Sequence, residues 1–152
     1  MKARLNHYAA APDAINAVLG LQKYVNDCGL EHSLLELVKI RASQINGCAF
    51  CLDMHTRDSR KLGDTEQRIY LLDAWEEAPL YSERERAALL WTETLTRVSE
   101  THAPDDVYER VKTQFTDAEL VNLTVAIGVI NTWNRLAIGF RAMPLVEKKA
   151  AA

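Results

Sequence analysis

The sequence predicts an all-α protein, a bundle of helices joined by short turns. Strand patterns are nearly absent, because no run of alternating β-branched residues occurs and no Asn-Gly pair is flanked by such runs. Helix start signals recur instead: some segments begin at Pro, and others begin at a Ser or Thr that is followed three residues later by Glu. Gly ends several of the segments. These two observations define the helices one by one.

Seven helical segments follow from these signals, over residues 13–28, 33–46, 48–62, 65–77, 82–99, 104–115 and 116–143. The first lies between Pro12 and Gly29, the usual asymmetry of helix starts and stops. The second opens with a capping-box pattern, in which Glu36 follows Ser33, and it carries apolar residues at helical spacing. The Asn46-Gly47 pair ends it, so the third helix starts at once.

The remaining four segments have equally local signals. The fourth ends before Pro79, whose ring disfavours helical backbone in the residue that precedes it. Capping-box patterns open the fifth and seventh, at 82–85 and 116–119, and Pro104 opens the sixth between them.

Length and composition restrict the class of protein. We expect one domain spanning residues 1–152, with a core motif at about 33–63. The 18 basic and 21 acidic residues give a net charge of −3, so nucleic-acid binding has no electrostatic support. Three cysteines cannot all pair within one chain, which favours a reducing, cytoplasmic location over a secreted disulfide scaffold. We expect no membrane contact, because residues 1–7 lack a signal-peptide pattern and the apolar stretch 120–140 is interrupted by polar residues.

One segment gathers residues suited to thiol chemistry. Cys48, Cys51 and His55 are spaced by three and four, which places them on one stripe of a helix. Cys48 falls in the first turn of that helix, where the free N–H groups and the partial positive charge lower a thiol pKa. His55 is one turn from Cys51 and is placed to take its proton, directly or through water.

Helix geometry nominates Glu36 as the group that orients this histidine. Glu36 lies about 16 Å up the second helix from the Gly47 turn, and His55 about 12 Å up the third. If the two helices form an antiparallel hairpin, both side chains reach nearly the same height. A carboxylate there would fix the imidazole tautomer and raise its basicity. The sequence thus supplies a candidate relay from Glu36 through His55 to Cys51, with Cys48 beside it.

Each of these residues also has a simpler interpretation. Glu36 could cap its own helix by reaching back to Ser33. The two cysteines and His55 could instead ligate zinc, with Glu36 as the fourth ligand. Against zinc, structural sites usually use two separated ligand pairs, and the sequence contains no second pair.

Other polar or reactive residues are weaker candidates. We expect Cys28 to be a small buried apolar residue, and the remaining histidines to be surface residues without partners: His7, His32 and His102. Arg41 is either one half of a buried ion pair or part of a solvated edge. A polar cluster interrupts the apolar last helix and predicts either a buried hydrogen-bonding or subunit-contact patch or a wall of the thiol pocket: Asn131, Trp133, Asn134 and Arg135.

At these residues the sequence resembles a known family. Glu36, an eleven-residue gap and Cys48-x-x-Cys51-x-x-x-His55 resemble the core of AhpD-like alkylhydroperoxidases, within the carboxymuconolactone decarboxylase superfamily. The segment from Glu36 to Cys48 and Asn131-Thr-Trp-Asn-Arg135 are also similar to that family, so the likeness covers most of the chain.

The resemblance implies an AhpD-like helical bundle that assembles into homo-oligomers, as trimers or hexamers. It implies that Cys51 attacks the peroxide, that Cys48 resolves the oxidised sulfur, and that His55 and Glu36 relay protons. No metal, flavin or haem is implied, and electrons come from an external dithiol or a lipoyl-bearing protein. One departure is Phe50, which occupies the position of a second histidine in the best-known member and predicts a simpler proton path or a weaker peroxidase.

These observations predict a thiol peroxidase that reduces hydroperoxides. The sulfenic acid on Cys51 would condense with Cys48 to a disulfide, and an external dithiol would restore both thiols. Two alternatives stay open. One is decarboxylation of a lactone acid, although such members generally lack the paired cysteines. The other is a redox-sensing or zinc-stabilised helical protein that binds partners without catalysis.

Overall fold

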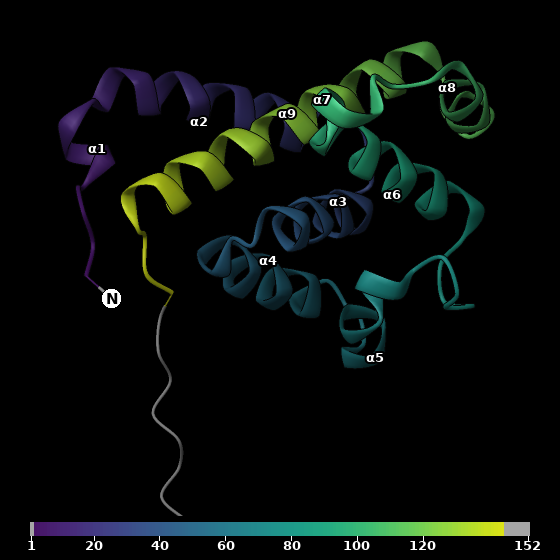
Figure 1. The fold of residues 1–152 in the computed structure, drawn as a ribbon, viewed down its shortest axis with the longest axis horizontal. Coiled ribbons are helices and arrows are strands. Elements are labelled where there is room, and N and C mark those ends of the chain that lie inside the picture. The colour runs from purple at the N-terminus through teal and green to yellow at the C-terminus, as the bar shows by residue number, and fades with distance from the viewer. Residues whose placement is uncertain (1, 145–152) are drawn as a thin grey trace, which may run out of the picture.

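The computed structural model describes residues 2–144, and across them helices alternate with turns and no strand occurs. The all-α prediction is confirmed. Nine α-helices and one 3₁₀ helix are found in the described residues: α1 (His7–Ala10), α2 (Pro12–Asp27), α3 (His32–Asn46), α4 (Ala49–Lys61), α5 (Glu66–Tyr70), η1 (Leu72–Ala74), α6 (Glu83–Thr96), α7 (Val98–Thr101), α8 (Asp105–Lys112) and α9 (Asp117–Phe140) (Figure 1).

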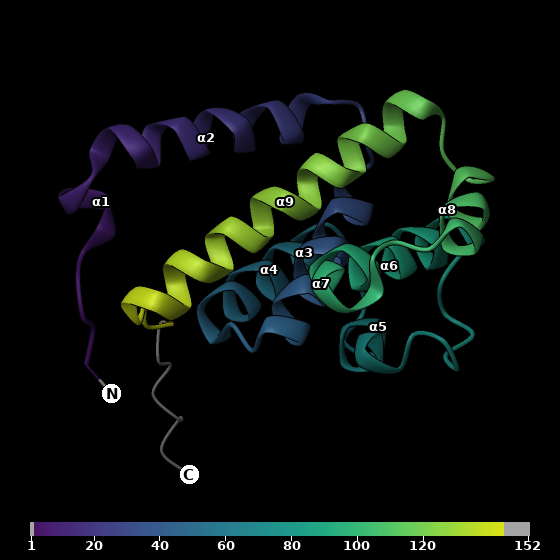
Figure 2. The same ribbon diagram turned by 45° about the horizontal axis from the view of Figure 1, so that its top comes forward.

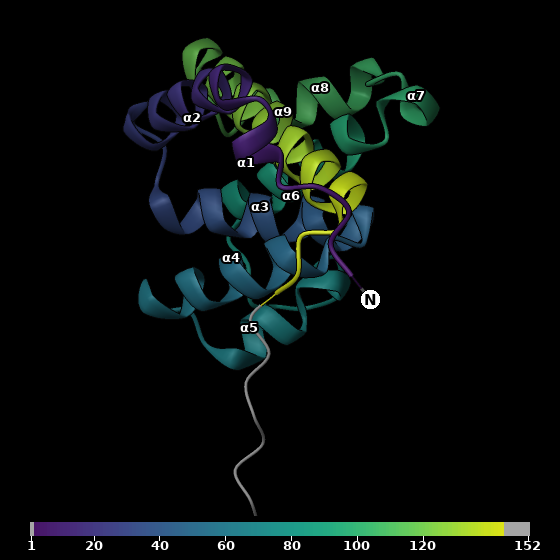
Figure 3. The same cartoon turned by 90° about the vertical axis from the view of Figure 1, so that its left-hand side faces the viewer.

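Helix α3 is the centre of the fold, and it packs against α4, α6 and α9 (Figure 3). Ten consecutive residues, 34–43, are buried, which is more than one helical face. A helix surrounded in this way must pair its charged side chains, because an isolated buried charge is costly. Arg41 is paired with Glu93 of α6 and with Asp73 of η1, so it is a buried ion-pair residue and not part of a solvated edge.

Three groups of buried apolar side chains hold the helices together. The largest joins α2, α3, α6, α8 and α9 around side chains such as Leu35 and Leu123. A second joins α3, η1 and α6. The third packs Cys48 and Cys51 against Ile130 of α9. The two thiols are therefore fixed between the α3–α4 turn and the last helix.

The turn from α3 to α4 depends on Gly47, whose φ of +68° lies in the left-handed region. Its N–H donates to Gln44 O at 3.1 Å, and the N–H of Cys48 donates to Ser43 O at 2.9 Å, the paired bonds of a Schellman motif. A side chain at a left-handed position costs about 1–2 kcal/mol, which explains why Gly ends the helix here. The motif makes Cys48 the N-cap of α4.

Helix α2 crosses α9 and contacts it near its own C-terminal end, where Tyr24 donates to Asn122, and the short α1 lies at an angle at the start of α2 (Figures 1 and 2). The segment before α1 is tied to the far end of α9, because Arg4 donates from its backbone N–H to Phe140 O and from its guanidinium to Gly139 O. The N-terminal residues therefore cover the same end of α9 that approaches α4. Within the described residues, no helix combines the length and the apolar character needed to cross a membrane.

Two predicted capping boxes are confirmed, at Ser82–Glu85 and Thr116–Glu119, with each side chain bonded to the other residue's backbone. The predicted Ser33–Glu36 capping box is wrong. Helix α3 begins at His32 with Glu31 as its N-cap, so Ser33 lies inside the helix and the Glu36 carboxylate bonds elsewhere.

Three other predicted helix boundaries are wrong. The fourth segment is divided into α5 and η1, and the tighter 3₁₀ turn brings Leu72 and Trp75, three residues apart, onto the same side and into the second core group. The fifth ends at Thr96 and is followed by the short α7. The last ends at Phe140, three residues early, because Arg141 adopts a φ of +57°.

Candidate active site

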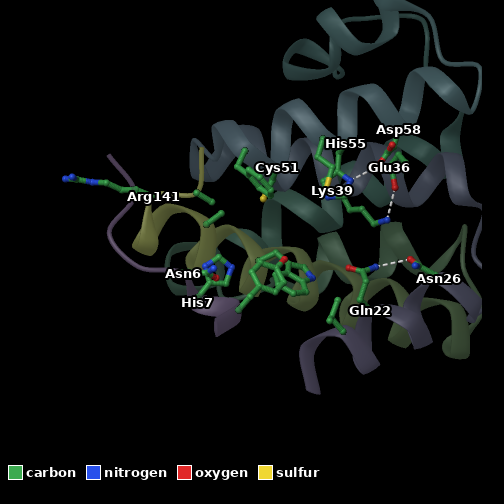
Figure 4. Close-up of a pocket in the computed structure, with 18 of the residues that line it drawn as sticks. Asn6, His7, Gln22, Asn26, Glu36, Lys39, Cys51, His55, Asp58 and Arg141 are labelled. Atoms are coloured by element: carbon green, nitrogen blue, oxygen red, sulfur yellow. Dashed lines mark hydrogen bonds and ion pairs between the residues drawn. The ribbon is translucent and has the colours of Figure 1, made fainter. Parts of the chain in front are cut away.

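A hydrogen bond of 2.8 Å joins Glu36 Oε2 to His55 Nδ1, and the Lys39 ammonium bonds the other carboxylate oxygen at 2.7 Å (Figure 4). The three side chains are about nine-tenths buried. Glu36 comes from α3 and His55 from α4, on opposite sides of the turn, so the equal heights expected from the spacing are confirmed. Lys39 had no part in the prediction.

The charge on Glu36 is maintained by its partners. Burial by itself would raise the pKa of the Glu36 carboxyl, but the bonds and charges of His55 and Lys39 outweigh burial and hold that pKa below its usual value of 4.5. An ionised carboxylate accepts the Nδ1–H of His55, which assigns proton transfer to Nε2. Glu36 thus fixes both the tautomer and the direction of the ring.

The two cysteines form a coupled pair at the start of α4. Both are 1% exposed and pack in one buried group, close enough for a protonated Cys51 thiol to stabilise a Cys48 thiolate by hydrogen bonding. That bond is the main reason why the pKa of Cys48 is lowered to about 7; burial opposes it, while backbone N–H groups of the first turn and the Asn134 amide assist. The same bond and burial raise the pKa of Cys51. Above a pH of about 7 the pair therefore carries one negative charge and one proton.

Access to this pair comes from a cavity of about 880 Å³, which Cys51 and His55 border and Cys48 does not. Its surface is mostly apolar, and its walls come from the N-terminal segment, α1, α2, α3, α4 and α9, with these large side chains among them: Leu5, Tyr8, Leu19, Phe50, Met54 and Trp133. Cys51 is thus the sulfur that a ligand in the cavity meets.

Several residues at this cavity were missed or misjudged from the sequence. Lys39 and Asp58 both border it, and the only signal was their spacing of three from Glu36 and His55. His7, expected at the surface without a partner, is half-buried at the cavity, and its ring stacks on Phe140 with centroids 5.7 Å apart. His32 is exposed, as predicted, and also borders the cavity. Nothing local in the sequence places the N-terminal segment beside α4.

A group of potential metal ligands exists, but it differs from the predicted zinc set. Among the described residues it consists of Glu36, His55 and Asp58, whose ligand atoms lie within 4.8 Å of one another. Neither cysteine belongs to it. Lys39 already occupies one oxygen of Glu36 and would repel a cation there.

The polar cluster of α9 is a buried hydrogen-bonding patch, one of the two predicted roles. Asn46 of α3 donates to the side-chain oxygens of Asn131 and Asn134, at 3.0 and 2.8 Å. Trp133 faces the cavity, so the cluster also contributes to the pocket wall. Cys28, expected to be buried, is half-buried and packs against the main core.

With this geometry established, the comparisons assign the family. The sequence matches the profile of the carboxymuconolactone decarboxylase family over residues 9–94, a span that contains Glu36, both cysteines of α4 and His55. The chain belongs to the carboxymuconolactone decarboxylase family.

Three relatives indicate which members of the carboxymuconolactone decarboxylase family it resembles. The uncharacterized protein YdfG of Bacillus subtilis (strain 168) is 44% identical over 138 residues, which cover 91% of this chain and 94% of YdfG. A second relative is a solved structure from Agrobacterium tumefaciens, of a protein of unknown function that is proposed to be the antioxidant defence protein AhpD. It is 52% identical, with a TM-score of 0.94, and the match covers 96% of this chain and 100% of that one. An uncharacterized peroxidase-related protein from Silicibacter sp. TM1040 is 25% identical with a TM-score of 0.80, covering 91% of this chain and 73% of that one.

Proposed function

We propose that this protein is a thiol-dependent hydroperoxide reductase that uses Cys51 and Cys48 as its redox pair. The observation that supports it best is the convergence of an acidic thiol pair and a carboxylate-oriented histidine, with Cys51 and His55 on one largely apolar cavity. Peroxidases of this kind need a thiolate, a proton donor for the leaving oxygen and a second thiol. The arrangement supplies all three.

The attacking thiolate forms by proton movement within the pair. In the resting state Cys48 holds the charge and Cys51 the proton. Transfer of that proton from Cys51 to Cys48 leaves the total charge unchanged and puts the thiolate at the cavity. This step reconciles the lower pKa of Cys48 with the attack by Cys51 that the family resemblance implies.

The remaining steps balance without a metal or an organic cofactor. The Cys51 thiolate attacks the distal oxygen of ROOH, the O–O bond breaks, and the leaving alkoxide takes the Cys48 proton through His55 to give ROH. The Cys48 thiolate then attacks the sulfenic sulfur of Cys51 and releases hydroxide, leaving a disulfide. An external dithiol reduces this disulfide by exchange and is itself oxidised.

The cavity favours a hydroperoxide with a bulky apolar group over hydrogen peroxide, because a space of about 880 Å³ with a mostly apolar surface can bury such a group and hydrogen peroxide has none. We propose a dithiol or lipoyl-type protein as reductant and a homo-oligomer as the working state. Exposed apolar side chains on α1 and α2 support assembly: Tyr8 is 50% exposed, Leu21 47% and Tyr24 53%.

The test is turnover of cumene hydroperoxide and of hydrogen peroxide with dihydrolipoamide, in wild type and in Cys51→Ser, Cys48→Ser and His55→Gln. We expect near-complete loss in Cys51→Ser, an accumulating sulfenic acid in Cys48→Ser, and a slowed reaction in His55→Gln. Cys28→Ser is the matched control, because Cys28 lies outside the cavity and should be dispensable.

Equal rates in all three variants would overturn the mechanism. Turnover of a lactone acid that does not depend on Cys51 would favour a decarboxylase instead. Stoichiometric zinc in the purified protein, lost on replacing His55, would favour a metal-stabilised interaction protein.

A further inference from the structure

Asn134 of α9 lies behind the thiol pair and is completely buried, with 0% of its surface exposed. Its helix contributes Ile130 and Ala137, one turn away on either side, to the same packed group as Cys48 and Cys51. A buried amide at such a position needs partners for one acceptor and two N–H donors. Its partners determine which atom faces the sulfurs.

The partners fix the orientation of the amide. The Asn134 oxygen accepts a hydrogen bond from Asn46 Nδ2 at 2.8 Å. One N–H donates to Ser43 Oγ at 3.0 Å. The Ser43 hydroxyl in turn donates its own hydrogen to Lys39 O at 2.7 Å. Since Asn46 can only donate and Ser43 can only accept here, a flipped amide would lose both bonds. The Asn134 nitrogen therefore faces Ser43, whose backbone oxygen accepts the N–H of Cys48, and its oxygen faces Asn46.

The second N–H has no oxygen acceptor among the hydrogen bonds of Asn134, and the amide lies close enough to the thiol pair to lower the pKa of both Cys48 and Cys51. A neutral donor suits a redox pair better than a cation would. It stabilises the thiolate of the reduced state, yet it leaves no unpaired buried charge when the pair becomes a disulfide.

We propose that Asn134 is a catalytic residue of the thiol pair, the neutral hydrogen-bond donor that stabilises the sulfur charge whichever of Cys48 and Cys51 carries it. Its effect on the rate rests on the proposed peroxidase function; its effect on the thiols does not. A donor shared by both sulfurs also lowers the barrier to proton movement between them, because the charge keeps a partner throughout.

The test compares the pH dependence of iodoacetamide labelling of Cys48 and Cys51, followed by mass spectrometry in a Cys28→Ser background without peroxide. Asn134→Leu removes the donor with little change in volume. We expect the midpoint of labelling to rise by about one pH unit, which slows labelling about tenfold at pH 6. Asn134→Asp, of the same shape but without the donor, should raise the midpoint at least as far, and it reports on the donor if the leucine variant does not fold.

Asn131→Leu is the matched control, an amide one turn away that bonds Asn46 and makes no bond to sulfur. We expect it to leave the midpoint unchanged. The charged groups that border the cavity from α3 and α4 stay the same in every variant: Glu36, Lys39, His55, Asp58 and Lys61.

Unchanged labelling midpoints in both Asn134 variants would overturn the proposal. An equal shift in Asn131→Leu would also overturn it, because the whole amide network, and not the Asn134 donor, would then set the pKa of the thiols. A wild type without peroxidase activity whose labelling still shifts in Asn134→Leu would refute the proposed function alone. An active wild type whose labelling does not shift would refute only the role of Asn134.

Discussion

Replacing Glu36 by Gln separates the structural role of this carboxylate from its chemical role. In wild type the carboxylate serves two partners, His55 and the Lys39 ammonium, whose side chain is 10% exposed. Glu36→Gln leaves that ammonium without its counter-charge, and breaking a buried ion pair typically costs about 3–5 kcal/mol. Lys39 borders the cavity, where water can reach it, so we expect a loss at or somewhat below the lower limit of that range, about 2–3 kcal/mol.

The double variant Glu36→Gln with Lys39→Met removes both charges. Because no unpaired charge remains, we expect it to recover more than half of the stability that Glu36→Gln loses. Peroxide turnover should not recover, because His55 still lacks the carboxylate that fixes its tautomer. Lys39→Met alone should cost less than Glu36→Gln, because His55 remains as a partner of the carboxylate.

The assay is denaturant and thermal unfolding of the four proteins, with peroxide turnover on the same preparations. A loss of about 2–3 kcal/mol lowers the melting temperature of a domain of this size by about 4–12 °C. Lys61→Met is the control, since that lysine is 74% exposed in its pair with Asp58 and its removal should change stability by less than about 1 kcal/mol.

Two outcomes would refute this reasoning. Wild-type stability in Glu36→Gln would mean that the Lys39 ammonium does not depend on the carboxylate. Full recovery of turnover in the double variant would mean that Glu36 acts only as a counter-ion and that His55 does not need it.

Two further predictions concern the turn that carries the thiols. The rate at which iodoacetamide labels the pair should increase as the pH rises through about 7, because the pKa of Cys48 is lowered to about 7. A labelling midpoint near pH 9.0, the pKa of an ordinary thiol, would contradict the shared hydrogen bond. Gly47→Ala should lower the free energy of unfolding by about 1–2 kcal/mol. The cost comes from the left-handed φ alone, because the added carbon meets no neighbouring atom within 4 Å. An unchanged denaturant midpoint would show that the backbone of the turn relaxes to accept the side chain.

Much of the fold could be predicted because its signals are local. The capping boxes at Ser82 and Thr116 and the Asn46-Gly47 stop act within a few residues, and each lies where the sequence indicated. Ser33 followed by Glu36 carried the same local pattern and failed, because burial of α3 gave the carboxylate stronger partners than a backbone N–H.

For the candidate site, the sequence by itself determined the pairing of Glu36 with His55 and the adjacency of Cys48 and Cys51, since helix rise and a one-glycine turn fix those positions. Only the tertiary structure decided that Lys39 shares the carboxylate, that Asn134 lies beside the thiol pair, and that the N-terminal segment lines a largely apolar cavity next to Cys51. Helical periodicity states which residues share a face of one helix. Which face of α9 or α2 meets α4 is decided by how side chains from distant segments fill the space between them, and no local pattern encodes that choice.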